Sequence, residues 1–123
     1  MRRLSAAVLL CAAACGGSAL SPQEKTERCQ DFAAAVAAGR LRTTPSEQVA
    51  RDVAASLDNK LSRLGTPALH TPAVQVHQHL HRVEAAQRRG DAAAADRASA
   101  DVRRAVSDLA DACDLPEAAF FGD

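Results

Sequence analysis

The chain has no tyrosine and no tryptophan, and only three of its 123 residues are phenylalanine. It also lacks segments in which β-branched or aromatic residues alternate with polar ones, the pattern typical of a half-buried strand. No glycine-rich phosphate loop, no Gly-x-Ser-x-Gly turn and no CxxC pair occurs. The missing strand pattern predicts an all-helical chain. The missing motifs give no indication of a catalytic site. We expect no catalytic activity.

The first 14 residues have the parts of an export signal. Two arginines provide positive charge, and an apolar run of about nine residues follows. A run this short cannot span a bilayer as a helix, which needs about 20 residues. Residues 12–14 are all alanine, and Cys15 comes next.

A short apolar run, three small residues and a cysteine together resemble the signal and lipid-attachment site of bacterial lipoproteins. The resemblance implies cleavage after residue 14, acylation of Cys15 with fatty-acid chains such as palmitate, and a short tether over residues 15–20. It implies an envelope protein that faces the periplasm or the exterior and is held at a membrane by its lipid. The alternative is ordinary secretion, with cleavage before Cys15 without lipid or after Ala19.

Residues 21–123 are long enough for one small domain. After removal of the signal, 13 basic residues face 15 acidic ones, a net charge of −2. This balance excludes the basic excess on which nucleic-acid binding depends.

Four apolar-periodic segments follow, each with signals for a helix start and a helix end. "SPQE" at Ser21 and "TPSE" at Thr44 have the capping-box pattern with proline in the first turn. We expect a non-helical connector over "TPALHTP", because its two prolines oppose a continuous helix. The third helix should then start at Thr71-Pro72, and Asp91 should cap the fourth. The expected ends are near Gly39, at Gly65, at "RRG" (88–90) and at Leu115-Pro116.

Similar helix lengths and short linkers predict an antiparallel, up-down-up-down four-helix bundle. Each helix has one apolar stripe that should face the core. The expected core positions are Cys29, Phe32, Ala33 and Val36, then Val49, Val53, Leu57, Leu61 and Leu64, then Ala73, Val76, Leu80 and Val83, and finally Ala95, Ala98, Val102, Val106, Leu109 and Cys113.

Cys29 and Cys113 remain once Cys11 leaves with the signal and Cys15 is acylated. In this topology the first helix starts where the fourth one finishes, and both cysteines lie on apolar stripes at that end. Because an oxidising envelope favours pairing, we predict a Cys29–Cys113 disulfide. Two buried free thiols are the alternative.

A histidine cluster, "VHQHLHRVE", lies in the third predicted helix. His77 and His81 are one turn apart, and Glu84 follows on the same side. Together they could hold Zn²⁺, Cu²⁺ or Ni²⁺, with water or another chain completing the shell. His79 lies on the other side and should not join them. His70 lies just upstream, beyond a proline, and could swing in. The alternative is that these are boundary histidines, which pack their rings and bind nothing.

Phe120 and Phe121 lie after the last predicted helix. We expect one or both to fold back over the end of the bundle beside Cys113. The alternative is an exposed patch that contacts a partner or a membrane. As a whole, the sequence predicts a small envelope lipoprotein with a binding or structural role and an unidentified envelope partner. The second hypothesis is a periplasmic metal-binding protein that uses His77, His81 and Glu84.

Overall fold

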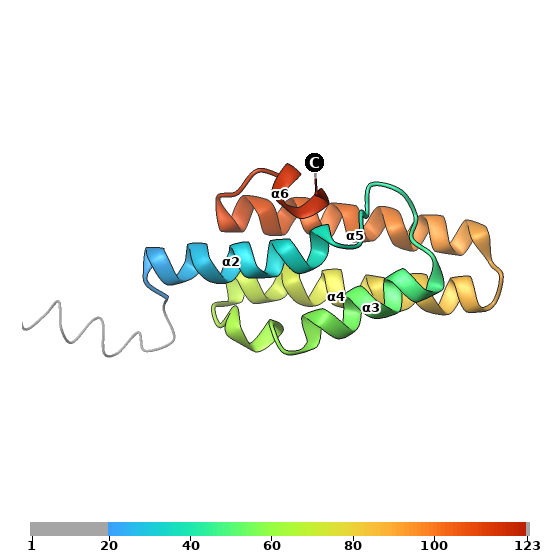
Figure 1. Ribbon diagram of the computed structural model, residues 1–123, viewed down its shortest axis with the longest axis horizontal. Helices are drawn as coiled ribbons and strands as arrows, with labels where there is room; N and C mark the ends of the chain where they lie inside the picture. Colours follow the sequence, from blue (N-terminus) through green and yellow to red (C-terminus); the bar gives the residue numbers. More distant parts are fainter. Residues whose placement is uncertain (1–19, 123) are drawn as a thin grey trace, which may run out of the picture.

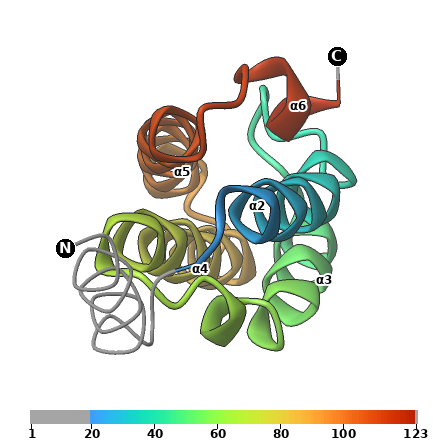
Figure 2. The same ribbon diagram turned by 90° about the vertical axis from the view of Figure 1, so that its left-hand side faces the viewer.

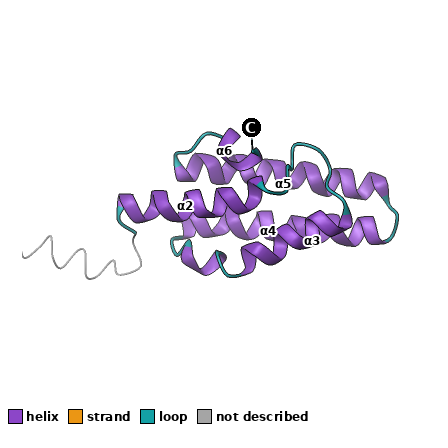
Figure 3. Cartoon of the chain, viewed as in Figure 1, coloured by secondary structure: helices purple, strands orange, loops and turns teal. Residues whose placement is uncertain are grey.

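The computed structural model describes residues 20–122, and every regular element in this range is a helix (Figure 3). The elements are α2 (Pro22–Ala37), α3 (Glu47–Asp58), the 3₁₀ helix η1 (Leu61–Arg63), α4 (Pro67–Arg88), α5 (Ala92–Cys113) and α6 (Ala118–Phe121). No helix in this range is long and apolar enough to cross a membrane. The predicted signal (1–14) and Cys15 lie outside the described residues.

Helices α2, α3, α4 and α5 run alternately in opposite directions, as expected for an up-down-up-down bundle (Figure 1). Seen end-on, α4 pairs with α5 on one side and with α3 on the other (Figure 2). Helix α2 packs on α3 and also contacts α6, which lies over α2 in this view. The C-terminal segment therefore covers α2, which contacts α6 more extensively than it contacts α5.

The apolar stripes form one core. Every expected inward position of α2, α4 and α5 is buried. Among those of the predicted second helix, only Val49 in α3 and Leu61 in η1 are partly exposed. Cys29 and Cys113 are joined by the predicted disulfide, with Cα atoms 5.9 Å apart. The disulfide covalently links α2 to α5 at the end where the described chain begins and α5 finishes.

Two of the predicted helix starts are confirmed in detail. The Ser21 hydroxyl accepts a hydrogen bond from the Glu24 N–H at 3.1 Å, and the Glu24 carboxylate accepts one from the Ser21 N–H at 3.3 Å. This reciprocal pair is the predicted capping box. At α5, the Asp91 carboxylate accepts from the Ala94 N–H at 3.0 Å. Local capping chemistry is sufficient to set both starts.

The start of α3 differs from the prediction. Ser46 is its N-cap and accepts from the Val49 N–H at 3.2 Å, whereas Thr44 had been expected in this role. Thr44 instead donates its hydroxyl to the Asp96 carboxylate of α5 at 2.8 Å. The Pro45 carbonyl accepts from the Gln87 side chain of α4 at 2.7 Å. These contacts with distant helices hold residues 44–45 outside α3.

The predicted connector over "TPALHTP" is wrong, because α4 begins at Pro67 and continues through Pro72. Pro72 removes one backbone donor from the second turn of the helix. That turn is nevertheless held against the core by Leu69 and Ala73, which are both buried. Helix α3 is shorter than expected and ends at Asp58 rather than at Gly65. The residues between α3 and α4 form η1 and its flanking turns.

Phe120 and Phe121 fold back, and both are buried, so they do not form an exposed contact patch. They pack as part of α6 beside the C-terminal half of α2 rather than over the bundle end next to Cys113 (Figure 1). The Arg42 guanidinium lies over the Phe121 ring, 4.5 Å from its centre.

Candidate metal centre

Asp58, His77 and His81 meet on the surface between α3 and α4. Each offers one ligand atom, and these three atoms lie within 4.8 Å of one another. His77 Nε2 is 2.5 Å from Asp58 Oδ1, a hydrogen-bond contact. The two imidazole rings meet edge to face, with their centres 4.6 Å apart. One carboxylate and two imidazoles thus converge on one point.

The buried neighbours of these residues fix their directions. Leu57 is fully buried, so the next residue, Asp58, emerges at the edge of the α3–α4 interface. On α4, Val76 and Leu80 are buried, which places His77 and His81 on the flank that faces α3. The side chain of His77 is 17% exposed and that of His81 is 54% exposed. The site is therefore open to solvent on the His81 side.

This donor set matches the preference of borderline divalent ions. Imidazole nitrogen and carboxylate oxygen bind Zn²⁺ at about 2.0–2.2 Å, and similar ligands suit Cu²⁺ and Ni²⁺. In a tetrahedral shell such ligand atoms would be roughly 3.3 Å apart. The Asp58 and His77 ligand atoms would have to separate by less than about 1 Å, and atoms now up to 4.8 Å apart would have to approach by about 1.5 Å. The side chains of Asp58, 60% exposed, and His81, 54% exposed, have room for these movements. A bound ion would take the place of the proton between Asp58 and His77.

Glu84 is not part of this group, which corrects the predicted ligand set. Its side chain is only 11% exposed and forms ion pairs with Arg51 of α3 at 2.9 Å and with Arg88 at 2.7 Å. The hydrogen bond from Arg51 lowers the pKa of Glu84 below its ordinary value, with smaller contributions in the same direction from His81 and Arg88. Glu84 is an anion held by two arginines. Its other oxygen, Oε1, lies 3.4 Å from Nδ1 of His81.

The other two histidines stay apart from the group, which was expected for His79 and left open for His70. His79 lies on the side of α4 that faces α5, and its Nδ1 is 3.3 Å from the Arg82 guanidinium. Burial lowers the pKa of His79, an effect that a nearby carboxylate, Asp101, partly opposes. Nδ1 of His70 is 3.1 Å from the Leu61 carbonyl oxygen.

Sequence reasoning missed Asp58. The predicted second helix ran on to Gly65, which would have placed Asp58 in a helix interior with no special relation to the histidines. The signal that could have found it is "LDNK" (57–60), where a capping residue, asparagine, follows the aspartate. A helix that ends there, followed by an antiparallel helix, places an acidic residue against the flank of that next helix.

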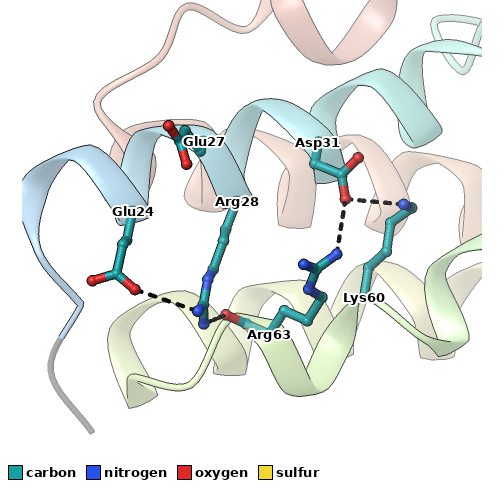
Figure 4. A pocket seen from close by; sticks show the side chains of 6 residues that line it. All are labelled: Glu24, Glu27, Arg28, Asp31, Lys60 and Arg63. Atoms are coloured by element: carbon teal, nitrogen blue, oxygen red, sulfur yellow. Dashed lines mark hydrogen bonds and ion pairs between the residues drawn. The ribbon is translucent and has the colours of Figure 1, made fainter.

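A hollow of about 400 Å³ lies between α2 and the segment that joins α3 to α4. Most of its charged side chains contact one another (Figure 4): Asp31 contacts Lys60 at 2.9 Å, and Arg28 donates to the Arg63 backbone carbonyl at 2.8 Å. Arg28 also pairs with Glu24 at 3.5 Å. These contacts fasten α2 to the rest of the bundle, and the hollow has no excess of either charge for a ligand.

In comparisons with protein-family models, curated proteins and solved structures, none matched this chain. The functional proposal therefore rests on the residues of the chain itself.

Proposed function

We propose that this protein is a lipid-anchored component of the bacterial cell envelope that acts by binding and not by catalysis. Its ligand is a divalent transition-metal ion held by Asp58, His77 and His81. The observation that carries this proposal is the convergence of one carboxylate oxygen and two imidazole nitrogens within 4.8 Å. The exposed side of the site leaves room for water or a group from another molecule as a further ligand.

The disulfide supports the envelope location. Cys29 and Cys113 are bonded, and stable disulfides belong mainly to oxidising compartments such as the periplasm. The other two cysteines, Cys11 and Cys15, both lie in the segment that resembles a lipoprotein signal. Lipid attachment at Cys15 would place the bundle close to a membrane surface, because the tether over residues 15–20 is short.

Metal binding is tested by calorimetric titration of the Cys15→Ala protein with Zn²⁺, Cu²⁺ and Ni²⁺. We expect one site that is lost in the His77→Ala/His81→Ala double variant. The matched control is His70→Ala/His79→Ala, which removes the two histidines outside the group and should leave binding unchanged. Equal binding by both double variants would contradict the proposed site, and no binding by the parent protein would contradict the function.

Lipid attachment is tested by the intact mass of the protein from the membrane fraction. The mass should include acyl chains, and Cys15→Ala should lose them and move the protein to the soluble fraction. Cys11→Ala is the matched control and should keep the acyl mass. An unmodified mature chain that begins at Cys15 or after Ala19 would favour ordinary secretion.

An envelope protein is the proposed partner, because an anchored binding protein without catalysis must pass its ligand, or its effect, to another molecule. Crosslinking in intact envelopes, with and without added metal, tests for it. A partner whose crosslink disappears in the His77→Ala/His81→Ala variant would connect metal binding to that contact. A crosslink unaffected by metal and by the variant would favour a structural role.

A further inference from the structure

We propose that Glu84 is a positioning residue of the metal site: it holds the proton of His81 on Nδ1 and so directs Nε2 of His81 to the ion. The inference rests on the proposed metal-binding function. It assigns a new role to Glu84, which was predicted from the sequence to be a ligand. It follows from the contacts of the two carboxylate oxygens of Glu84.

The two oxygens of Glu84 have different partners. Oε2 accepts from Nε of Arg51 at 2.9 Å and from Nη2 of Arg88 at 2.7 Å. Oε1 faces Nδ1 of His81 at 3.4 Å. Because the arginines come from two helices, they fix the carboxylate in position and leave one oxygen directed at the imidazole.

A neutral imidazole carries its proton on one nitrogen and can bind a metal only through the other. A carboxylate anion beside Nδ1 favours the tautomer with the proton there, which leaves the lone pair on Nε2. Metal-ligating histidines commonly have such a carboxylate on their second nitrogen, where it fixes the ring and raises its basicity. Glu84 satisfies this arrangement from three residues further along the same helix, slightly less than one turn.

Glu84 is held too firmly to serve as a ligand. Its side chain is largely buried, and movement toward the ion would break contacts with two arginines. Asp58, in contrast, is exposed and has no arginine partner among the described contacts. The two carboxylates therefore have different roles. Asp58 binds the ion, and Glu84 orients the imidazole of His81.

A matched control exists in the same network. Glu47 contacts Arg51 at 2.5 Å and Arg88 at 3.3 Å, but it has no contact with His81 among the described interactions. Glu47→Ala and Glu84→Ala each remove one carboxylate from the same two arginines. Only Glu84→Ala removes the neighbour of Nδ1. A merely structural effect should be similar in the two variants.

The first measurement is the tautomer of His81 in the metal-free protein at a pH where the ring is neutral, from the ¹⁵N chemical shifts of its two nitrogens. We expect the proton on Nδ1 in the parent protein and in Glu47→Ala. In Glu84→Ala the proton should shift toward Nε2. Glu84→Gln keeps a carbonyl acceptor at this position and should largely restore the parent pattern. Glu84→Leu keeps most of the side-chain volume but offers no acceptor to Nδ1, so it makes the same test as Glu84→Ala if that variant does not fold.

The second measurement is the affinity for Zn²⁺ by calorimetry. Glu84→Ala should weaken binding by about 10- to 100-fold, the usual effect of removing such a partner, and Glu47→Ala should leave it nearly unchanged. Equal losses in both variants, or a tautomer that does not depend on Glu84, would overturn the positioning role. If the parent protein binds no metal, the proposed function fails, and the tautomer still shows whether Glu84 controls the His81 proton.

Discussion

Asp58 and His77 are 19 residues apart in the chain, and a hydrogen bond of 2.5 Å between Oδ1 and Nε2 joins them across the α3–α4 interface. The contact brings together the last residue of one helix and the middle of the next. Both atoms are ones that a metal ion would use. Binding an ion here replaces a shared proton, so we expect affinity to fall as the pH is lowered.

Replacing Asp58 tests this pair directly. Asp58→Asn keeps the shape of the side chain but removes the anionic ligand, and we expect it to weaken Zn²⁺ binding by at least about tenfold. Asp52→Asn is the control, because Asp52 lies on the same helix and bonds to the Gln48 side chain at 2.8 Å, away from the histidines. Calorimetry should separate the two variants. Unchanged affinity in Asp58→Asn would mean that Asp58 is not a ligand of the metal ion.

The disulfide should contribute much of the stability of this domain. Cys29 and Cys113 are 84 residues apart, and closing a loop of that length contributes about 4–5 kcal/mol in the chain-entropy model. The Cys29→Ser/Cys113→Ser variant should therefore unfold at a much lower urea concentration. Reductant should lower the midpoint of the parent protein to that of the variant and leave the variant unchanged. A parent midpoint that resists reductant would show that the bond adds little.

The capping box at the start of α2 should make stability depend on pH. Hydrogen bonds with Ser21 lower the pKa of Glu24 below its ordinary value. The Ser21 side chain has the larger effect and the Ser21 backbone the smaller one. A carboxyl with a lowered pKa in the folded state stabilises the fold above its unfolded pKa. This contribution is lost as the pH falls through the folded value.

Ser21→Ala should therefore raise the pKa of Glu24 and lower the free energy of unfolding at neutral pH by about 1 kcal/mol, the usual effect of losing an N-cap. The difference between variant and parent should shrink in acid. NMR titration of Glu24 and urea unfolding at several pH values measure both effects. Gln23→Ala is the control, since among the described contacts the Gln23 side chain bonds to Glu27, on the same exposed helix surface. If the pKa of Glu24 is unchanged in Ser21→Ala, Ser21 is not the cause of its low value.

The C-terminal helix should behave as part of the core. Phe120 is fully buried, and truncating such a side chain to alanine typically costs about 3–5 kcal/mol. We expect Phe120→Ala to lower the thermal midpoint strongly, whereas the exposed Glu117→Ala should have little effect. Phe120→Ala with parent-like stability would mean that this segment does not pack on the bundle in solution.

Features that depend on neighbours in the chain were predictable. The starts of α2 and α5 follow from Ser21 and Asp91, whose side chains cap the backbone next to them. The apolar stripes were also correct, because burial follows the helical period. The disulfide followed from combining those stripes with the antiparallel topology.

Features that depend on contacts between helices were not predictable. Thr44 has the chemistry of an N-cap, yet Asp96, 52 residues away, takes its hydroxyl. Pro72 signals a break, yet the burial of Leu69 and Ala73 keeps the helix continuous. Tertiary packing overrides local preference at both positions.

The candidate site shows the same division. His77 and His81 share a face because they are one turn apart, a relation internal to one helix. Whether Glu84 or Asp58 joins them depends on the arginines of two helices and on where α3 ends. No pattern within α4 distinguishes a carboxylate held by Arg51 from one free to bind.

The position of the disulfide also determines how the domain would respond to mechanical force. A pull between the start of α2 and α6 would pass from residue 22 to Cys29, through the bond, and on from Cys113. The 83 residues between the two cysteines, which include the candidate metal centre, would bear no tension. In a single-molecule experiment the reduced protein should extend further than the oxidised one by roughly 290 Å, the contour length that the bond withholds.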